Sequence, residues 1–515
     1  MRPALRLCLP VLAAAVLLAG CDASPQTAPG DQIRISAVAG VAVDRPHPAA
    51  VDVQANGLAA GLGSDLTAYL AQQVTWSACG KLECADVLAP LDYTDPSARA
   101  LTLSMARRTA TRSPRLGTLF INPGGPGASG KSLVSSFDTT GLEQYDIVGW
   151  DPRGTGDSTP VRCFDGARTD AFLNLDSSPD TEAERTTLIA ATYEFGQSCW
   201  EHSGVLLEHI STIETARDLD LLRQLLGDAT LNYFGYSYGT QIGATYAELF
   251  PQNTGRLVLD AAVDITDDDQ VIQAMGFDLA LGNFAGWCAG EGCELGGTKQ
   301  DVLDAITGLF DTLDSAPLPV KDRVLTQSLA VTGVAAMLYG GRTAWPTLAT
   351  MIGAARGGNG RGLLLAADSQ NARNDNGSYG TLLYAFPAIS CLDSDQDRGV
   401  LDADRVWLED QKKAPIFGKY FGPSYGCALW PVQPSRQLDI RGVGARPIVV
   451  IGGTGDNATP YQQAVTMARQ LDSGVLVTYD GEGHGSYGGK SACVDKLVVN
   501  YLVDDVVPDN GVRCS

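Results

Sequence analysis

The chain has 515 residues, a formal net charge of −22 and a sequence pI of about 4.5. That length allows a large core and more than one structural unit. The acidic balance argues against the basic surface of a nucleic-acid-binding protein, so we expect no nucleic-acid partner. The negative charge mainly indicates solubility.

The N-terminus predicts an export signal. Arg2 and Arg6 precede an apolar run, Leu9 to Ala19, that is too short to span a bilayer. The run ends in Leu17-Leu18-Ala19-Gly20-Cys21, which resembles a bacterial lipobox with Cys21 as the lipidated residue. An ordinary secretory signal is the alternative. We expect a signal over residues 1–20, a tether and N-terminal extension over 21–64, and a cell-surface lipoprotein or a secreted protein.

A glycine-rich turn follows the first predicted core strand, Leu116 to Asn122. It reads Asn122-Pro123-Gly124-Gly125-Pro126-Gly127. It lacks the Lys-Ser/Thr ending of a P-loop and the spacing of a dinucleotide-binding turn, which disfavours phosphate binding. Serine acyl transfer needs two backbone N–H groups aimed at the oxyanion, and one typically comes from such a loop. We expect Gly124 or Gly125 to donate it.

Two more elements come before the central motif. Tyr145 to Trp150 reads as a strand, and Ser211-Thr212-Ile213-Glu214 is a capping box that begins a helix. Gly227 ends this helix after Leu226. Its apolar positions form a packing stripe rather than a site.

The stretch Gly235-Tyr236-Ser237-Tyr238-Gly239 follows the G-x-S-x-G pattern. An apolar run precedes it and a helix-compatible run, Gln241 to Phe250, follows it. Strand, sharp turn and helix are the context of a nucleophile elbow, whose flanking positions must be small. Ser237 is the predicted nucleophile, and the N–H of Tyr238 the second oxyanion donor. A structural turn is the alternative.

A long insertion follows the next predicted strand, Arg256 to Asp260. It is rich in helix-forming residues and would lie over the C-terminal ends of the strands as a cap on the site. We expect a first part of the core over residues 65–264, the cap over 265–400, and a C-terminal part that completes the core over 401–515.

The remaining partners follow in the order Ser, Asp, His. Pro447 to Gly452 reads as a buried parallel strand, and Asp456 lies just beyond its end. A helix-cap or turn aspartate is the alternative. Val475 to Tyr479 reads as the next strand and His484 follows it; of four histidines, only this one comes after both the serine and the acid. Glu482 is the fallback acid.

Cysteine usage agrees with export. Of twelve cysteines, two belong to the signal and ten remain. An even number in an exported chain suggests disulfides. We expect nearest-neighbour pairing. Zinc is disfavoured because no histidine lies near the two closest pairs, and we expect no metal.

Four motifs together resemble the secreted tripeptidyl aminopeptidases, which are α/β-hydrolase serine exopeptidases related to prolyl aminopeptidases. The motifs are Asn122 to Gly130, Asp151-Pro152-Arg153-Gly154, Ala216-Arg217-Asp218-Leu219-Asp220 and Gly235 to Thr240. The resemblance covers roughly Thr67 to Ser515. It implies an α/β-hydrolase fold with a mostly parallel central sheet and a large, mainly helical cap, and it implies no cofactor.

The same resemblance implies the roles of the site residues. Ser237 would be the nucleophile, Asp456 the orienting acid and His484 the base. One departure is Asn457-Ala458, where relatives often carry Pro-Val. The resemblance does not fix the substrate, because the family also contains members whose substrates are esters or unknown.

The expected activity is that of an aminopeptidase that releases short peptides from free N-termini. A lipase or esterase with the same triad and a catalytically silent binding protein are the alternatives. A free α-ammonium would need carboxylates at the closed end of the cleft. Asp264 and Asp393 are the candidates, against the alternative of ordinary capping or solvated aspartates.

Overall fold

The computed structural model describes residues 57–515, apart from 267–269 and 395–398. The predicted signal, Cys21 and most of the tether lie outside the described residues. Within them, no helix is long and apolar enough to cross a membrane.

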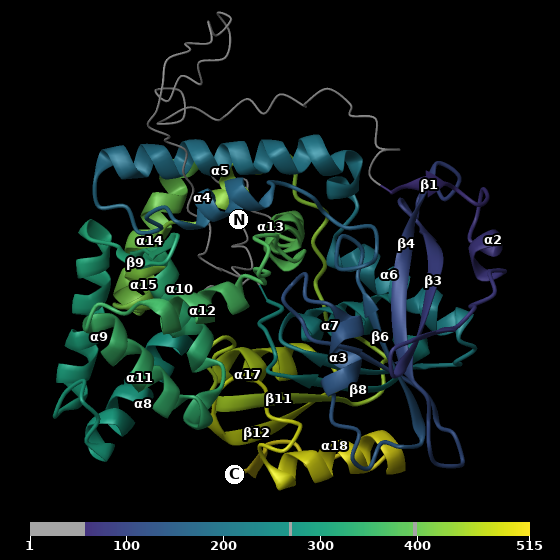
Figure 1. The fold of residues 1–515 in the computed structure, drawn as a ribbon. Coiled ribbons are helices and arrows are strands. Elements are labelled where there is room, and N and C mark those ends of the chain that lie inside the picture. Colours follow the sequence, from purple (N-terminus) through teal and green to yellow (C-terminus); the bar gives the residue numbers. More distant parts are fainter. Residues whose placement is uncertain (1–56, 267–269, 395–398) are drawn as a thin grey trace, which may run out of the picture.

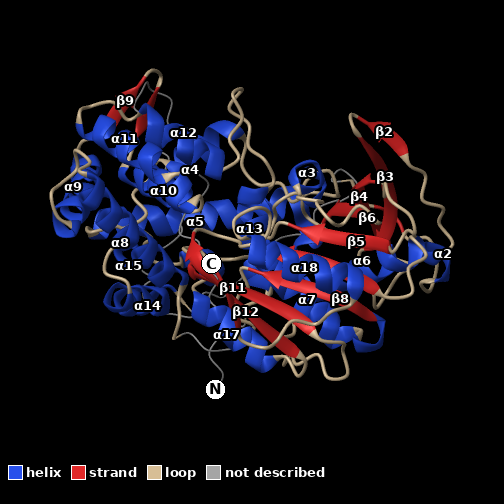
Figure 2. Ribbon diagram, turned by 90° about the horizontal axis from the view of Figure 1, so that it is seen from below, coloured by secondary structure: helices blue, strands red, loops and turns tan. Residues whose placement is uncertain are grey.

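One twisted sheet forms the centre of the molecule (Figure 2). Its parallel strands are, in spatial order, β13 (Val512–Cys514), β12 (Gly474–Glu482), β11 (Ile448–Gly455), β8 (Thr254–Asp260), β7 (Leu231–Tyr236), β5 (Gly117–Asn122) and β6 (Tyr145–Asp151). An antiparallel edge continues beyond β6 as β4 (Arg99–Arg108), β3 (Leu82–Pro90) and β2 (Ser77–Cys79), while β1 (Ala59–Ala60) pairs with β4. This arrangement confirms the predicted α/β fold with a mostly parallel sheet.

Alternate residues of the central strands enter different cores, as the two-residue period of a strand requires. Leu119 and Ile121 of β5 face one core, which also contains residues of α3 (Gly130–Ser136) and α18 (Ala492–Asp504). Phe120 lies between them in sequence and faces the other core. That second core includes residues of α6 (Thr212–Leu225), α7 (Tyr238–Leu249) and α17 (Tyr461–Gln470). Helices therefore cover both faces of the sheet.

A large helical cap is inserted between β8 and β11 (Figure 1), as predicted. Its helices are α8 (Gln273–Glu291), α9 (Lys299–Ser315), α10 (Gln327–Leu338), α11 (Trp345–Arg356), α12 (Arg361–Gln370), α13 (Leu382–Leu392), α14 (Val400–Lys413), α15 (Phe417–Tyr420) and α16 (Tyr425–Ala428). A short hairpin, β9 (Leu318–Val320) with β10 (Arg323–Leu325), was not predicted. Helices continue well past residue 400, and the sheet resumes only at Ile448.

Two helices from before the elbow also belong to this cap, and the sequence analysis did not predict them. They are α4 (Gly166–Leu173) and α5 (Glu182–Ser203), which runs along the top of Figure 1. Arg373 in the cap pairs with Asp170 of α4 at 2.7 Å, and Arg185 of α5 pairs with Asp404 of α14 at 2.6 Å. The cap is thus assembled from separate stretches of chain.

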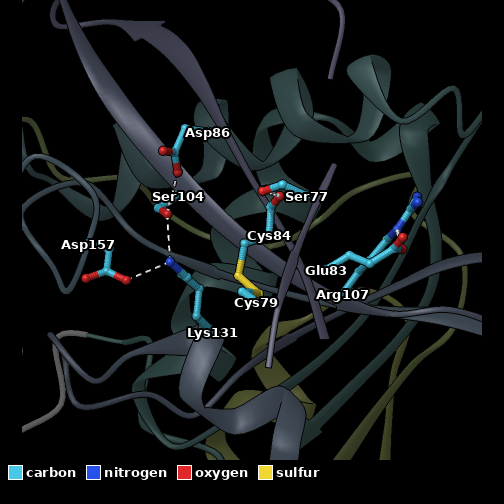
Figure 3. The surroundings of a disulfide bond; sticks show 9 residues. All are labelled: Ser77, Cys79, Glu83, Cys84, Asp86, Ser104, Arg107, Lys131 and Asp157. Atoms are coloured by element: carbon cyan, nitrogen blue, oxygen red, sulfur yellow. Dashed lines mark hydrogen bonds and ion pairs between the residues drawn. A yellow bond between two sulfur atoms is a disulfide. The ribbon is translucent and has the colours of Figure 1, made fainter. Parts of the chain in front are cut away.

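The five disulfides in the described part of the chain confirm nearest-neighbour pairing. They are Cys79–Cys84, Cys163–Cys199, Cys288–Cys293, Cys391–Cys427 and Cys493–Cys514. Figure 3 shows the first of these, which closes the hairpin of β2 and β3 at the antiparallel edge of the sheet. On the neighbouring strand, Arg107 forms an ion pair with Glu83 at 2.7 Å.

Candidate active site

Ser237 lies at a sharp turn between β7 and α7. Its φ of 55° and ψ of −128° are outside the backbone regions that residues other than glycine usually adopt. A β-carbon at Gly235 would lie 2.4 Å from the carbonyl oxygen of Gly239, and one at Gly239 would lie 3.0 Å from the carbonyl oxygen of Asn122. The strained serine and its crowded glycines have the local geometry of a nucleophile elbow.

The two candidate glycines of the turn after β5 have different surroundings. The N–H of Gly124 donates to Oδ1 of Asn122 at 2.8 Å, so this group already has a partner. Gly125 instead lines the cavity that contains Ser237. Tyr238 is the first residue of α7, where a backbone N–H has no carbonyl of its own helix to donate to. Gly125 and Tyr238 are therefore the better placed pair of donors.

Gly124 has a different role, which is to allow close approach of the turn to the elbow. A β-carbon there would lie 2.9 Å from Cβ of Ser237 and 2.9 Å from the amide nitrogen of Tyr238. Its φ of +93° also favours glycine. Any side chain at this position would enter the space beside the serine and the Tyr238 amide.

Asp456 and His484 meet at the C-terminal ends of β11 and β12. Nδ1 of His484 lies 2.9 Å from Oδ1 and 3.0 Å from Oδ2 of Asp456. The amides of Ala458 and Thr459 both donate to Oδ1 at 2.9 Å. Burial opposes the charge of this carboxylate, but the histidine and the amides outweigh it and hold the pKa of Asp456 below its ordinary value. An ionised acid on Nδ1 leaves Nε2 available to exchange a proton.

The fallback acid, Glu482, lies in another environment. Its carboxylate accepts from Nδ2 of Asn283 at 3.1 and 3.3 Å. Gly455 packs directly against it, because a β-carbon there would lie 2.4 Å from Oε2 of Glu482. The acid bonded to His484 is Asp456.

The cap contacts the histidine loop directly. The amide of His484 donates to the carbonyl oxygen of Tyr339 at 3.1 Å, and the two rings meet edge to face with centroids 5.3 Å apart. A β-carbon at Gly341 would lie 2.6 Å from the carbonyl oxygen of Glu482. Tyr339 was not predicted, because nothing in its local sequence places it beside a loop so far along the chain.

Ser237 and His484 line one cavity of about 290 Å³. The core side of this cavity is completed by Pro123, Gly125 and Ala128. The cap side is formed by Tyr339, Gln370 and Asn371, and by Leu382, Leu383, Phe386 and Pro387 of α13. Among the described residues, no Asp, Glu, Lys or Arg lines it. The sequence did not reveal the cap wall, because its residues come together only in the folded chain.

The structure does not bring the two predicted ammonium ligands into this cavity. Oδ1 of Asp264 accepts from the amide and the hydroxyl of Thr266, at 2.8 and 2.6 Å, within a local turn. Asp393 accepts from the amide of Thr212 at 2.9 Å and from its hydroxyl at 2.5 Å, at the start of α6. The Thr212 hydroxyl also contacts that of Tyr238. Asp393 thus supports the residue after the serine instead of lining the cavity.

Three potential metal ligands gather elsewhere in the described part of the chain. Atoms of Asp92, His209 and Glu214 lie within 4.8 Å of one another. The buried guanidinium of Arg153 lies 3.8 Å from Glu214, and a cation already accompanies this carboxylate. None of the three lines the cavity of Ser237.

Comparison with known proteins agrees with this geometry. Residues 117–337 match the family described as the alpha/beta hydrolase fold, and residues 414–514 match the TAP-like protein family. The serine protease Hip1 of Mycobacterium tuberculosis is 35% identical over 482 residues, which cover 86% of this chain and 91% of Hip1.

Two further relatives carry different names. Carboxylesterase B of M. tuberculosis is 35% identical and is matched over 87% of this chain and 91% of its own. The tripeptidyl aminopeptidase of Streptomyces lividans is 30% identical, with 85% of each chain covered. With its fold, elbow and histidine–aspartate pair, the chain belongs to the α/β-hydrolase enzymes of the tripeptidyl-aminopeptidase-like family.

Proposed function

We propose that this protein is an exported serine hydrolase that releases short peptides, tripeptides in the first instance, from free N-termini. The observation that carries the proposal is the junction of three elements at one cavity. The strained Ser237, the Asp456-bonded His484 and the Gly125 turn all meet there. Relatives named serine protease and tripeptidyl aminopeptidase support a peptide substrate.

The chemistry follows from these positions. His484 takes the proton of Ser237 Oγ as that oxygen attacks the substrate carbonyl, and it later protonates the leaving amine. Asp456 fixes the imidazole tautomer and stabilises the imidazolium. The N–H groups of Gly125 and Tyr238 bind the oxyanion. By analogy with measured oxyanion donors, each lowers the activation free energy by about 3–4 kcal/mol. Water then cleaves the acyl-enzyme.

One observation favours a second candidate, an esterase that acts on neutral acyl groups. The cavity wall contributed by the cap is largely apolar, and no carboxylate among the described residues lines the cavity. Burying an α-ammonium there without a partner would be costly. A relative named Carboxylesterase B also supports this candidate.

A substrate panel separates the two candidates. We would compare free tripeptide amides, their N-acetylated forms and neutral esters, with wild-type protein and Ser237→Ala. An aminopeptidase cleaves the free peptides and rejects the acetylated ones, whereas an esterase favours the esters. Ser237→Ala should lose the fluorophosphonate adduct and about a million-fold in kcat. Near-wild-type turnover by this variant would refute the assignment of the nucleophile.

We also propose that the protein is anchored outside the cell through lipid on Cys21. The lipobox-like sequence before Cys21 and the five disulfides support this location. Mass spectrometry of the exported protein should find lipid on Cys21 as the N-terminal residue. An unmodified cysteine at that position would exclude the anchor.

A further inference from the structure

Asp260 occupies a central place in the sheet that the chemistry described so far does not use. It is the last residue of β8, and its side chain is fully buried. Strand β8 lies between β7, which leads to Ser237, and β11, which leads to Asp456. In register, Asp260 pairs with Tyr236 of β7 on one side and with Ile451 of β11 on the other.

Asp260 bonds to both the serine and the histidine loop. Its carbonyl oxygen accepts the amide of Ser237 at 3.0 Å. Its carboxylate oxygen Oδ2 accepts the amides of Ser486 and Tyr487, both at 2.8 Å. These two residues follow closely after His484, so one side chain ties the loop of the base to the strand end beside the nucleophile.

The two acids share the anchoring of this loop. Oδ2 of Asp456 accepts the amide of Gly485 at 3.4 Å, and Asp260 accepts the next two amides. Three consecutive amides after His484 therefore point at buried carboxylates. Asp456 orients the imidazole ring itself, while Asp260 holds the backbone that carries the ring.

The burial of Asp260 and the backbone conformation of the next residue are both energetically unfavourable. Burial raises the pKa of Asp260, although the amides of Tyr487 and Ser486 counteract that rise. The next residue, Ala261, has a φ of +54°, a left-handed conformation that a residue with a side chain rarely adopts. A buried carboxylate beside a strained alanine persists only where the surrounding structure enforces it, and such strain clusters at functional sites.

We propose that Asp260 is a positioning residue that sets the separation of His484 from Ser237. The inference rests on the proposed serine-hydrolase function. It assigns to Asp260 no contact with the substrate. Removing its carboxylate would leave two amides of the loop without their acceptor and let the imidazole drift from the serine oxygen. A misplacement of about 1 Å at a reacting group costs about 100-fold in rate.

The variants Asp260→Ala and Asp260→Asn distinguish positioning from a general structural role. The alanine variant should lose about 100-fold in kcat with KM within about threefold of wild type, because the substrate cavity is unchanged. The asparagine variant keeps an acceptor oxygen, although a neutral one that makes weaker bonds. It should restore kcat to within about tenfold of wild type. Labelling by a fluorophosphonate should slow in parallel with kcat.

Two other aspartates provide matched controls. Asp278 in the cap accepts the amides of Ile416 and Phe417, at 3.1 and 2.7 Å, which is the same kind of bonding to a segment outside the histidine loop. Asp495 of α18 accepts the amides of Gly488 and Gly489, at 2.9 and 3.0 Å. These two glycines lie farther along the loop that carries His484. Asp278→Ala and Asp495→Ala should lower the melting temperature and leave kcat within about threefold of wild type.

The outcomes separate this inference from the proposed function. If wild-type protein neither reacts with the fluorophosphonate nor hydrolyses any amide or ester, the proposed function fails. If wild-type protein is active and Asp260→Ala keeps its kcat, or loses no more than Asp278→Ala, the positioning role is refuted. Should the alanine variant not fold, Asp260→Asn decides the question. A three- to tenfold loss in kcat at constant KM supports the role, and a wild-type kcat refutes it.

Discussion

Gly124 shows at the scale of one residue how closely the two catalytic loops approach. A methyl group there would lie 2.9 Å from both Ser237 Cβ and the Tyr238 amide nitrogen. We expect Gly124→Ala to reduce kcat at least about 100-fold, the effect of losing one oxyanion donor. The measurement is steady-state hydrolysis together with fluorophosphonate labelling.

Gly227 is the control for that substitution. It also has a positive φ, of +79°, but no atom lies within 4 Å of where its β-carbon would be. Gly227→Ala therefore carries the same left-handed strain, about 1–2 kcal/mol, without the steric conflict. It should lower stability and leave kcat unchanged. Equal losses of kcat in the two variants would show that strain alone, and not access to the oxyanion site, matters at Gly124.

Asp393 should make the stability of the protein depend on pH. Burial raises the pKa of Asp393 to about 7 from an ordinary 3.8, so the folded state favours the protonated acid. The stability that this pKa shift contributes to the folded state is fully present below about pH 4 and is lost as the pH rises to about 7. The shift of about three units corresponds to at most about 4 kcal/mol.

The variant Asp393→Asn tests this dependence, because an amide can still accept from the Thr212 backbone and does not ionise. The free energy of unfolding of the variant, relative to wild type, should rise between pH 4.5 and about pH 7 and level off at higher pH. Urea denaturation at several pH values measures the difference, in which the titration of all other groups largely cancels. A difference independent of pH would show that Asp393 keeps an ordinary pKa in the folded protein.

The sequence pointed to Ser237, Asp456 and His484 as candidates, because each follows a recognisable strand in a fixed order, and the structure places Asp456 against His484 and lines one cavity with His484 and Ser237. It could not separate Gly124 from Gly125, since only the side chain of Asn122 shows which N–H already has a partner. It placed Asp393 in the wrong environment because the neighbour of that residue, Thr212, lies far away in sequence. Tyr339 left no local signal at all.

At the scale of an element, α13 connects one disulfide of the cap to the cavity. It contributes Leu382 and Phe386 to the cavity wall, and Cys391 at its end is bonded to Cys427 of α16. This disulfide closes a loop of 36 residues. Because it restricts the unfolded chain, it stabilises the folded state by about 4 kcal/mol. Replacing both cysteines by alanine should lower stability by about that amount and raise KM several-fold, because the wall loosens.

The disulfide Cys79–Cys84 is the matched control, because it closes a loop of only five residues at the far edge of the sheet. Its removal should cost about 2 kcal/mol and leave both kinetic constants unchanged. Chemical denaturation and steady-state kinetics on both double variants measure the contrast. An unchanged KM without Cys391–Cys427 would mean that packing alone fixes α13.

The strands around the site were predictable because each contains a short apolar run. The run Pro447 to Gly452 became β11 (Ile448–Gly455), and Val475 to Tyr479 became β12 (Gly474–Glu482). The edge strands β3 and β4 were missed, and so was α5. The buried stripe of α5 includes the polar residues Thr192, Ser198 and Ser203, so its apolar pattern in the sequence is weak.

At the scale of the whole molecule, the sequence predicted the cap as one continuous insertion after β8. The cap also includes two earlier helices, α4 and α5. A gap in the strand pattern reveals an insertion, but it does not reveal which earlier helices pack on it. The contacts that hold them, such as Arg373 with Asp170, join residues about two hundred positions apart. For the same reason, the end of the cap could not be read from composition.

The cap and the sheet should unfold together. Independent domains usually meet through polar interfaces of modest size. Here one hydrophobic core contains Phe120 and Leu257 of the sheet together with Phe310 and Trp345 of the cap. Hydrogen bonds also join them: the His484 amide donates to the Tyr339 carbonyl at 3.1 Å, and the Gly156 amide donates to the Thr381 hydroxyl at 2.8 Å.

Calorimetry of the oxidised protein should therefore show a single heat-absorption peak, although chains of this size commonly unfold in several steps. Loss of hydrolysis with temperature should coincide with the change in tryptophan fluorescence, because Trp150 reports on the sheet and Trp345 on the cap. Two peaks, with activity lost in the first, would show that the cap melts from an intact sheet. Opening of the cap would then become an available route for substrate entry, which the continuous core argues against.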